Sequence, residues 1–109
     1  MAWLVRDGTV LASAELATTR RERRRGLLGR EHVEGAIVLR PCRQVHTLAM
    51  RFPIDVVWCA DDGRVVRAAT LKPWRVSRAV WKARFVIEAE SGAVHRWGLQ
   101  PGDVIEIVA

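Results

Sequence analysis

The fold is decided by residues 54–71, which read Ile54-Asp55-Val56-Val57-Trp58-Cys59-Ala60-Asp61-Asp62-Gly63-Arg64-Val65-Val66-Arg67-Ala68-Ala69-Thr70-Leu71. The first seven are mostly apolar or β-branched, which is typical of a buried strand. Asp61-Asp62-Gly63 supplies residue types that tolerate the backbone of a tight turn, and residues 64–71 continue as a partly buried strand. The stretch therefore predicts a β-hairpin.

Similar short apolar segments lie on both sides of this hairpin. They are bounded by Asp-Gly, proline or charged turns, and they are residues 3–5, 10–16, 36–39, 42–50, 85–89 and 104–108. Residues 72–84 show no clear period, so we expect a loop or an unpaired edge strand there that permits pairing with another chain. Seven or eight short strands predict a mostly β fold, a β-sandwich or open barrel that forms one domain over residues 1–109.

Two short helices interrupt this pattern. Thr19 and Glu22 have the spacing of a capping box, which predicts an N-terminal surface helix of about ten residues that ends near Gly29. We expect Leu27 and Leu28 to anchor one end of it against the core while its arginines face solvent. Residues 91–97 predict a second short helix, which Gly98 terminates.

The charge of the chain favours anionic partners. The 109 residues carry a formal net charge of +6, and half of them are hydrophobic, as in an ordinary globular protein. Six arginines and two glutamates lie between Arg20 and Glu31, so most of the excess charge falls in the first predicted helix. Nucleic acid is the first anionic partner to consider, although it is not the favoured one.

The remaining composition predicts a cytoplasmic protein without a membrane span. No apolar run approaches the ~20 residues that cross a bilayer, and the first residues lack the basic and apolar regions of a signal peptide. We expect Cys42 and Cys59 to stay reduced. There is no glycine-rich nucleotide motif, so no cofactor is predicted.

The stretch Val45-His46-Thr47-Leu48-Ala49-Met50-Arg51-Phe52-Pro53-Ile54-Asp55 resembles the central motif of the domain-of-unknown-function 192 (DUF192) family, also called uncharacterised protein family 0127. Further pieces follow the family's order, and the match covers roughly residues 14–108. These pieces are Ala17-Thr18 with Glu22-Arg23, Gly26-Leu27-Leu28, Val86-Ile87-Glu88 with Gly92, and Gly98-Leu99 with Gly102-Asp103. Four pieces in order are more specific than any one of them.

The resemblance implies a compact β-rich fold and supplies no mechanism. The commoner motif reads Trp-Met-Lys-Asn-Thr before Ile-Pro-Leu-Asp, whereas residues 46–50 occupy those five positions here. The chain thus resembles a variant of the form His-Thr-x-x-Met-x-x-Pro-x-Asp. No role of the tryptophan or asparagine of the commoner form carries over, and candidate sites must come from the chemistry of the residues.

Sulfur and imidazole ligands occur at a period of two in the predicted strand 42–50. Cys42, His46 and Met50 are a ligand set suited to copper or zinc. At about 3.3 Å per residue, however, Cys42 and His46 lie about 13 Å apart along a straight strand, too far for one ion. No metal site is predicted unless a bulge or another strand brings the ligands together.

Two catalytic arrangements are conceivable, and no catalytic residue is assigned. If residues 50–55 turn between paired strands, the register places His46 opposite Trp58 or Cys59 and Met50 near Asp55. A Cys–His pair generates a nucleophilic thiolate, but no oxyanion donor or orienting group can be identified beside it. Glu88 and Glu90 share one face of a predicted strand as a conceivable carboxylate dyad, and no second feature supports it.

Three other features admit a structural and a functional interpretation. Asp55 follows an apolar turn that contains Pro53, where it is expected to accept hydrogen bonds from turn amides or to enter a ligand pocket. Arg23 either pairs with Glu22, Glu31 or a strand carboxylate, or binds an anionic ligand. Trp74 and Trp81, with Lys82, either form a basic aromatic surface with the helix arginines or fill the core.

We therefore predict a small non-enzymatic ligand-binding or accessory domain whose ligand-binding residues are His46, Met50, Asp55 and Arg23. One alternative is a small enzyme with a pocket around His46 and Asp55. Another is a nucleic-acid or anion-binding module that uses the arginine-rich helix. The partner is a small ligand or a protein, and the chain is expected to be a monomer or a weak homo-oligomer.

Overall fold

The hairpin at the centre of the sequence is formed in the computed structural model, which describes residues 2–109. Strand β4 (Ile54–Cys59) is buried along its whole length and pairs antiparallel with β5 (Val65–Leu71). The other hydrogen-bonding edge of β4 pairs antiparallel with β6 (Phe85–Glu90). Three segments separated by turns thus form the middle of one sheet.

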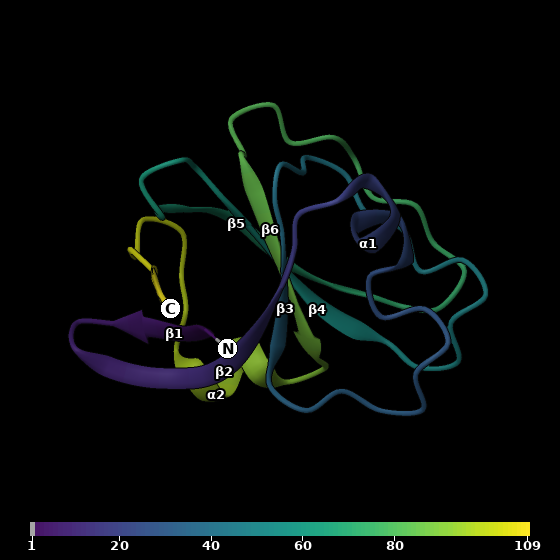
Figure 1. Cartoon of the computed structure of the whole chain (residues 1–109), viewed down its shortest axis with the longest axis horizontal. Helices are drawn as coiled ribbons and strands as arrows, with labels where there is room; N and C mark the ends of the chain where they lie inside the picture. The colour runs from purple at the N-terminus through teal and green to yellow at the C-terminus, as the bar shows by residue number, and fades with distance from the viewer. Residues whose placement is uncertain (1) are drawn as a thin grey trace.

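Residues 2–109 form seven strands and two short helices (Figure 1). The remaining elements are β1 (Ala2–Arg6), β2 (Thr9–Ala17), α1 (Arg20–Arg25), β3 (Ala36–Leu39), α2 (Ala93–Trp97) and β7 (Glu106–Val108). The strand order is β5-β4-β6-β3-β2-β1-β7. The pair β2 and β3 is parallel, and α1 lies in the connection between them.

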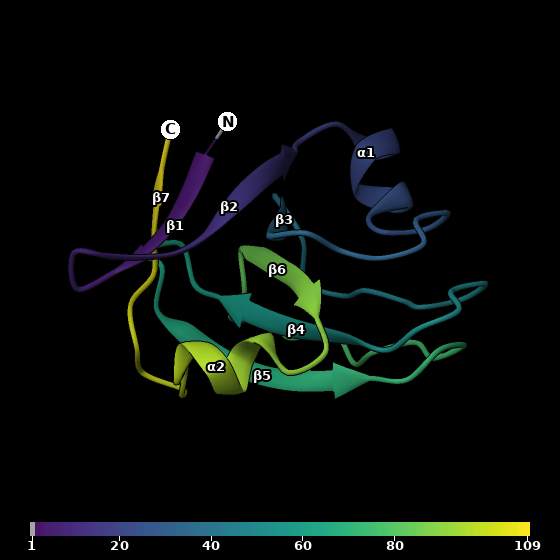
Figure 2. The same cartoon turned by 90° about the horizontal axis from the view of Figure 1, so that it is seen from below.

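The sheet curls until its two edges meet at one corner, as the view in Figure 2 shows. Strand β7 pairs with β1, while residues 102–105 just before it bond to the start of β5. The N–H of Val65 donates to the Asp103 carbonyl at 2.7 Å, and the N–H of Ile105 donates to the Gly63 carbonyl at 2.9 Å. The mostly β prediction is confirmed, and the single curled sheet has the shape of a half-barrel.

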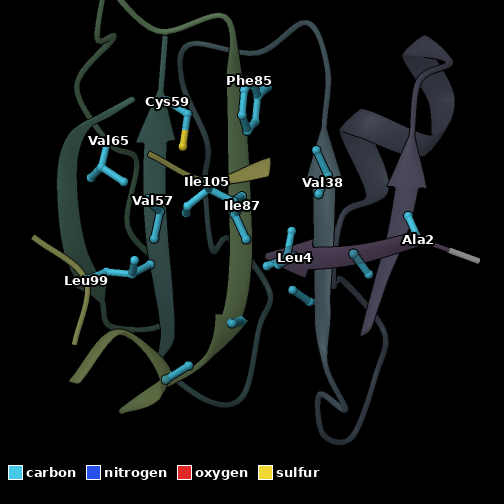
Figure 3. Close-up of a cluster of buried hydrophobic side chains, with 14 residues drawn as sticks. Ala2, Leu4, Val38, Val57, Cys59, Val65, Phe85, Ile87, Leu99 and Ile105 are labelled. Carbon is cyan, nitrogen blue, oxygen red and sulfur yellow. The ribbon is translucent and has the colours of Figure 1, made fainter. Parts of the chain in front are cut away.

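The central strands are buried on both faces, so the curled sheet separates two apolar clusters. Along β4, the side chains of Val57 and Cys59 enter the first cluster, whose members converge inside the curl (Figure 3). The side chains of Val56 and Trp58 enter the second cluster, which also contains Leu27 from the turn after α1. A polar side chain on β3, β4 or β6 therefore faces one of two cores.

The predicted first helix is shorter than expected. Its capping box is present, because the Thr19 hydroxyl accepts from the Glu22 N–H at 3.1 Å and the Glu22 carboxylate accepts from the Thr19 N–H at 3.0 Å. The helix ends at Arg25 because Gly26 adopts a φ of +48°. Leu27 and Leu28 pack on the second cluster from the turn that follows, so the expected anchoring is confirmed.

The strand predicted over residues 42–50 is wrong. That segment is a loop in which His46 forms one isolated bridge with Val76. Thr47 explains the irregular path, because its buried hydroxyl donates to the Lys72 carbonyl at 2.6 Å and accepts from the Arg75 N–H at 3.0 Å. Residues 72–84 are consequently a loop fastened to residues 42–50, and the sheet edges are β5 and β7.

The corner where the sheet edges meet supplies a stability test. Gly63 has a φ of +91°, and a Cβ built on it would lie 2.1 Å from the Ile105 carbonyl oxygen. We expect Gly63→Ala to lower the free energy of unfolding by at least about 2 kcal/mol, because it combines backbone strain with a backbone clash. Urea denaturation measures the loss.

Gly8→Ala is the matched control for this test. Gly8 has a similar φ of +77°, and a Cβ there would meet nothing within 4 Å. Strain alone should cost about 1 kcal/mol. Equal losses for the two substitutions would contradict the close contact at the corner.

Candidate functional site

A cavity of about 300 Å³ lies between the end of α1, the sheet and residues 41–50. The floor is formed by Leu39 of β3 and Glu88 of β6, and one wall by the turn that carries Gly26 and Leu27. This volume is at the lower end of the range that small-ligand sites occupy in proteins. It is the location in which several of the predicted site residues meet.

Glu88 is the acidic residue at the floor of this cavity. Its residue surface is only 3% exposed, and its cross-strand neighbours are the apolar Ile37 and Val56. Within residues 2–109 no N–H or O–H group donates a hydrogen bond to its carboxylate. No side-chain oxygen of the described residues is both fully buried and without a partner, so the Glu88 carboxylate is accessible from the cavity, where it presents an acceptor that no protein group uses.

Gly26 leaves the space that the Glu88 carboxylate occupies. A Cβ on Gly26 would lie 2.8 Å from Glu88 Oε1 and 3.8 Å from the nearest Leu39 methyl group. The same glycine ends α1 with its positive φ. One residue thus both terminates the helix and admits the acid beneath it.

Burial raises the pKa of Glu88 from its ordinary value to about 7. The physical cause is the loss of water around a charge that has no compensating partner. At neutral pH the carboxyl is therefore divided between its neutral and ionised forms. A cationic or hydrogen-bond-donating group in the cavity would shift it toward the ionised form.

The rim of the cavity is cationic. Arg23, Arg24 and Arg25 of α1 and Arg43 of the following loop line it. Arg23 donates a hydrogen bond to the Thr18 carbonyl, and among residues 2–109 it forms no ion pair, so the alternative in which it pairs with a carboxylate is wrong. The rim therefore carries uncompensated positive charge.

Cys42, His46 and Met50 line the same cavity from residues 41–50. The Cys42 thiol donates to the Gln44 carbonyl at 3.3 Å, and His46 Nδ1 accepts from the Leu48 N–H at 3.2 Å. Burial raises the pKa of the Cys42 thiol; the Glu88 charge raises it further, whereas the Arg23 charge lowers it. These opposing effects show that Arg23 and Glu88 each lie within electrostatic reach of the Cys42 thiol.

Asp55 lies on the opposite face of the sheet, so the structure does not bring it to the cavity. Its carboxylate accepts from the N–H groups of Gly92 at 3.1 Å and Val94 at 3.0 Å, and from the Thr70 hydroxyl at 2.7 Å. It thus holds the start of α2 against β4. The amides it binds are distant in sequence and are not those of its own turn.

The register that placed His46 opposite Trp58 or Cys59 is wrong. Cys59 pairs with Val65 and Phe85, and it is buried in the first cluster. Burial raises the pKa of its thiol to about 12, and the Asp62 charge contributes to the increase. This thiol has no imidazole partner in the sheet and stays protonated at neutral pH.

Glu88 and Glu90 do not form a carboxylate dyad, because their side chains have different surroundings. Glu90 is exposed and forms an ion pair with Arg96 of α2 at 2.5 Å, whereas Glu88 faces the cavity under α1. In the described part of the chain no group of three His, Cys, Asp or Glu side chains is arranged to hold a metal ion. Nor does any helix of residues 2–109 have the length and hydropathy to cross a bilayer.

Comparison with known proteins settles the family. The model of DUF192, described as Uncharacterized ACR, matches residues 2–107. The chain belongs to the DUF192 family. A UPF0127 protein of Thermococcus gammatolerans is 33% identical over 97 residues, which are 84% of this chain and 63% of that protein. A UPF0127 protein of Thermococcus kodakarensis is 32% identical over 97 residues, which are 84% of this chain and 62% of that one. This DUF192 chain therefore spans just over three fifths of the length of these relatives.

Solved structures share the fold of this DUF192 chain. A protein of unknown function from Novosphingobium aromaticivorans has a TM-score of 0.80 and 23% sequence identity, over 96% of this chain and 82% of that one. A candidate transcription regulator from Sinorhizobium meliloti has the same TM-score and identity, over 96% of this chain and 90% of that one. At this identity the similarity extends to the fold alone.

Glu88 is the residue whose importance the sequence did not reveal. Its position in the family-like segment Val86-Ile87-Glu88 gave one signal, because an acid stood between Ile87 and Ala89 of a strand predicted to be buried. Its isolation depends on α1 covering that face, which follows from the β2–β3 crossover and cannot be derived from local pattern.

The buried acid predicts a pH-dependent penalty on stability. Because the pKa of Glu88 is raised in the folded state, the folded protein binds more protons than the unfolded one between about pH 4.5 and about pH 7. Its destabilising contribution therefore grows over this interval and is constant above it. We expect Glu88→Gln to match the wild type at low pH and to exceed it by roughly 3 kcal/mol above neutrality.

Urea denaturation of both proteins at about pH 5 and about pH 8 tests this expectation. Glu90→Gln is the control, because Glu90 is exposed and paired with Arg96. A difference between Glu88→Gln and wild type that stays constant with pH would contradict the burial of an unpaired acid.

The hydrogen bonds of Asp55 to the start of α2 predict that its substitution lowers the stability of the fold. Asp55→Asn removes one of the two carboxylate oxygens that accept from Thr70, Gly92 and Val94, so we expect the free energy of unfolding to fall by about 1–3 kcal/mol. Thr70→Val, which removes only the hydroxyl contact, should cost less. Thermal unfolding by circular dichroism measures both, and unchanged stability in Asp55→Asn would contradict this structural role.

Proposed function

We propose that this DUF192 chain is a small-molecule-binding domain whose site is the cavity between α1, Glu88 and residues 41–50. Three of the four residues predicted from the sequence to bind a ligand, Arg23, His46 and Met50, line that cavity. The fourth, Asp55, lies on the other face of the sheet, where it lines a depression at the start of α2. A ligand contact of Asp55 would therefore belong to a separate site.

One observation carries this proposal: a nearly buried carboxylate that has no hydrogen-bond donor in the described chain and faces a cavity. An unpaired buried acid costs stability, and structural roles do not require it. A ligand that brings a donor to Glu88 offsets this cost. Polar groups that are unsatisfied in the free protein are a common feature of binding sites.

The lining residues define the chemistry of the ligand. Glu88 selects a hydrogen-bond donor, preferably a cationic amine, at the floor of the cavity. Arg23 and its neighbours select an anionic group at the rim. The apolar side chains of Leu27, Leu39 and Met50 accommodate a short aliphatic body between them. A small zwitterion that carries its amine and its acid at opposite ends satisfies all three.

Binding is favoured over catalysis by the state of the two thiols. The pKa of both Cys42 and Cys59 is raised by burial, so neither supplies a thiolate nucleophile at neutral pH. Both are free cysteines. Reduced thiols suit the cytoplasm, which we propose as the location, and we propose a monomer or weak homo-oligomer as the working state.

Isothermal titration with ω-amino acids of increasing chain length tests the proposal. We expect at least one of them to bind at least about tenfold more tightly than the alkylamine and the carboxylate of the same length, because only the zwitterion engages both ends of the site. Glu88→Gln should weaken binding of the zwitterion and the amine. Arg23→Gln should weaken binding of the zwitterion and the carboxylate.

A pH series with Glu88→Gln separates Glu88 from the other titratable or cationic groups at the cavity, which are Arg23, Arg24 and Arg25 on α1 and Cys42, Arg43 and His46 on the loop. Amine affinity should rise as pH increases through about 7, where Glu88 ionises, and Glu88→Gln should abolish this rise. Asp61→Asn, at an exposed turn outside the cavity, is the control. If no ω-amino acid binds, or if Glu88→Gln leaves binding unchanged, the proposal is wrong.

A further inference from the structure

Two long loops at the end of the molecule away from the termini are basic and contain no acidic residue. They are residues 40–53, between β3 and β4, and residues 72–84, between β5 and β6 (Figures 1 and 2). Their basic residues number eight: Arg40, Arg43, Arg51, Lys72, Arg75, Arg78, Lys82 and Arg84. Among residues 2–109, Arg40 is the one member of this set that forms an ion pair.

The two loops are held together as one surface, which we call the loop face. Thr47 of the first loop accepts from the Trp74 N–H at 2.9 Å and donates its own N–H to the Arg75 carbonyl at 2.8 Å. Further along, Arg43 Nε donates to the Trp81 carbonyl at 3.2 Å. Because Val45, Thr47 and Ser77 are buried, the loops are anchored on the inside and present the intervening side chains to solvent.

The loop face also exposes large apolar side chains among its charges. Trp81 is 79% exposed, Trp74 63%, Val76 60% and Leu48 41%. The bridge between His46 and Val76 places Val76 on the strand-like part of the second loop, next to Trp74 and opposite the segment that carries Leu48. Exposed apolar side chains that gather on one surface are typical of interaction sites.

Backbone strain at Trp74 is a second indication that the exposed side chains of the loop face have a function. Trp74 has a φ of +63°, a left-handed conformation that is costly for a bulky side chain. The hydrogen bonds of residues 74 and 75 to Thr47 hold it there. In this conformation Trp74 is exposed, between the half-buried Pro73 and the exposed Arg75. Strain of this kind concentrates at functional sites.

We infer that the loop face docks the protein on the surface of an anionic phospholipid membrane. Tryptophan side chains favour the headgroup region, because their rings are apolar and their indole N–H is polar. Val76 and Leu48 gain from transfer into the boundary between headgroups and acyl chains. The unpaired lysines and arginines around them match the negative charge of the lipid phosphates.

The aliphatic residues decide between this occupant and a nucleic acid. Bases stack on tryptophan rings and phosphates pair with arginine, so a single strand would use the aromatic and basic side chains. It would leave Val76 and Leu48 exposed without gain. The loops also project as tips at the end of the molecule in Figure 2, a shape suited to a flat surface. Residues 41–46 and Met50 of the first loop also line the ligand cavity, whereas no residue of the second loop does. Because the test changes Trp74 and Val76 of the second loop, the inference is independent of the ligand cavity.

Sedimentation with vesicles of phosphatidylcholine mixed with phosphatidylglycerol, compared with pure phosphatidylcholine, tests the inference. The full chain should bind the anionic vesicles at least about tenfold more tightly, and the difference should shrink as salt rises. Brominated phosphatidylcholine in the anionic vesicles should quench part of the tryptophan fluorescence. Trp58, which is buried in the second cluster, should remain unquenched.

The variant W74N/V76T removes the apolar contacts and keeps the fold, because asparagine tolerates the positive φ and threonine keeps the shape of valine. We expect it to bind anionic vesicles at least about tenfold more weakly, with an unchanged melting temperature. The matched control is Trp3→Thr, which removes a tryptophan that is 42% exposed on β1, at the end that carries the termini. It should bind as the wild type does.

Three results would overturn the inference. The first is the absence of binding to anionic vesicles, and the second is equal binding by wild type and W74N/V76T. The third is tighter binding to a random single-stranded oligonucleotide than to anionic vesicles, with loss of that binding in W74N/V76T. This last result would assign the loop face to nucleic acid instead. None of these outcomes alters the expected response of the cavity to Glu88→Gln.

Discussion

The structure depends on a sheet whose central strands are covered on both faces. Two buried carboxylates lie in these strands, one on each face, and their hydrogen bonding differs. Asp55 faces α2, where the N–H groups of Gly92 and Val94 replace the water it has lost. Glu88 faces α1, where none of residues 2–109 donates a hydrogen bond to it. Since both acids experience burial, the difference in hydrogen bonding separates a structural acid from one that is available to a ligand.

The position of α1 makes Glu88 available. The capping box at Thr19 and Glu22 sets the start of the helix, and Gly26 sets its end directly over the acid. Leu27 then enters the second cluster and fixes the turn to the sheet. The arginines follow from this placement, because a helix whose buried contact lies beyond its last residue fully buries none of its own side chains. The cationic rim and the acidic floor are thus two consequences of one short connection between β2 and β3.

The elements that could be predicted are those set by neighbouring residues. The β4–β5 hairpin, the β1–β2 hairpin around Asp7-Gly8 and the capping box all depend on contacts within a few positions. The segment 42–50 was predicted as a strand because its composition is apolar, yet its partner is the distant loop 72–84, reached through Thr47. Of the predicted site residues, three share the cavity, because all belong to segments that border α1. Asp55 does not, because alternation along β4 turns it to the other face.

The charge distribution has a similar origin in long-range structure. The eight basic residues of the loop face are spread over two segments, so no local run reveals them, and the run in α1 attracts attention first. Thr47 brings the two segments together, and the same contacts hold Trp74 in a strained backbone and expose its indole. His46 borders both the loop face and the cavity. Residues 41–50 therefore form a physical connection between the cavity and the second loop, through the contacts of Thr47 with residues 74 and 75.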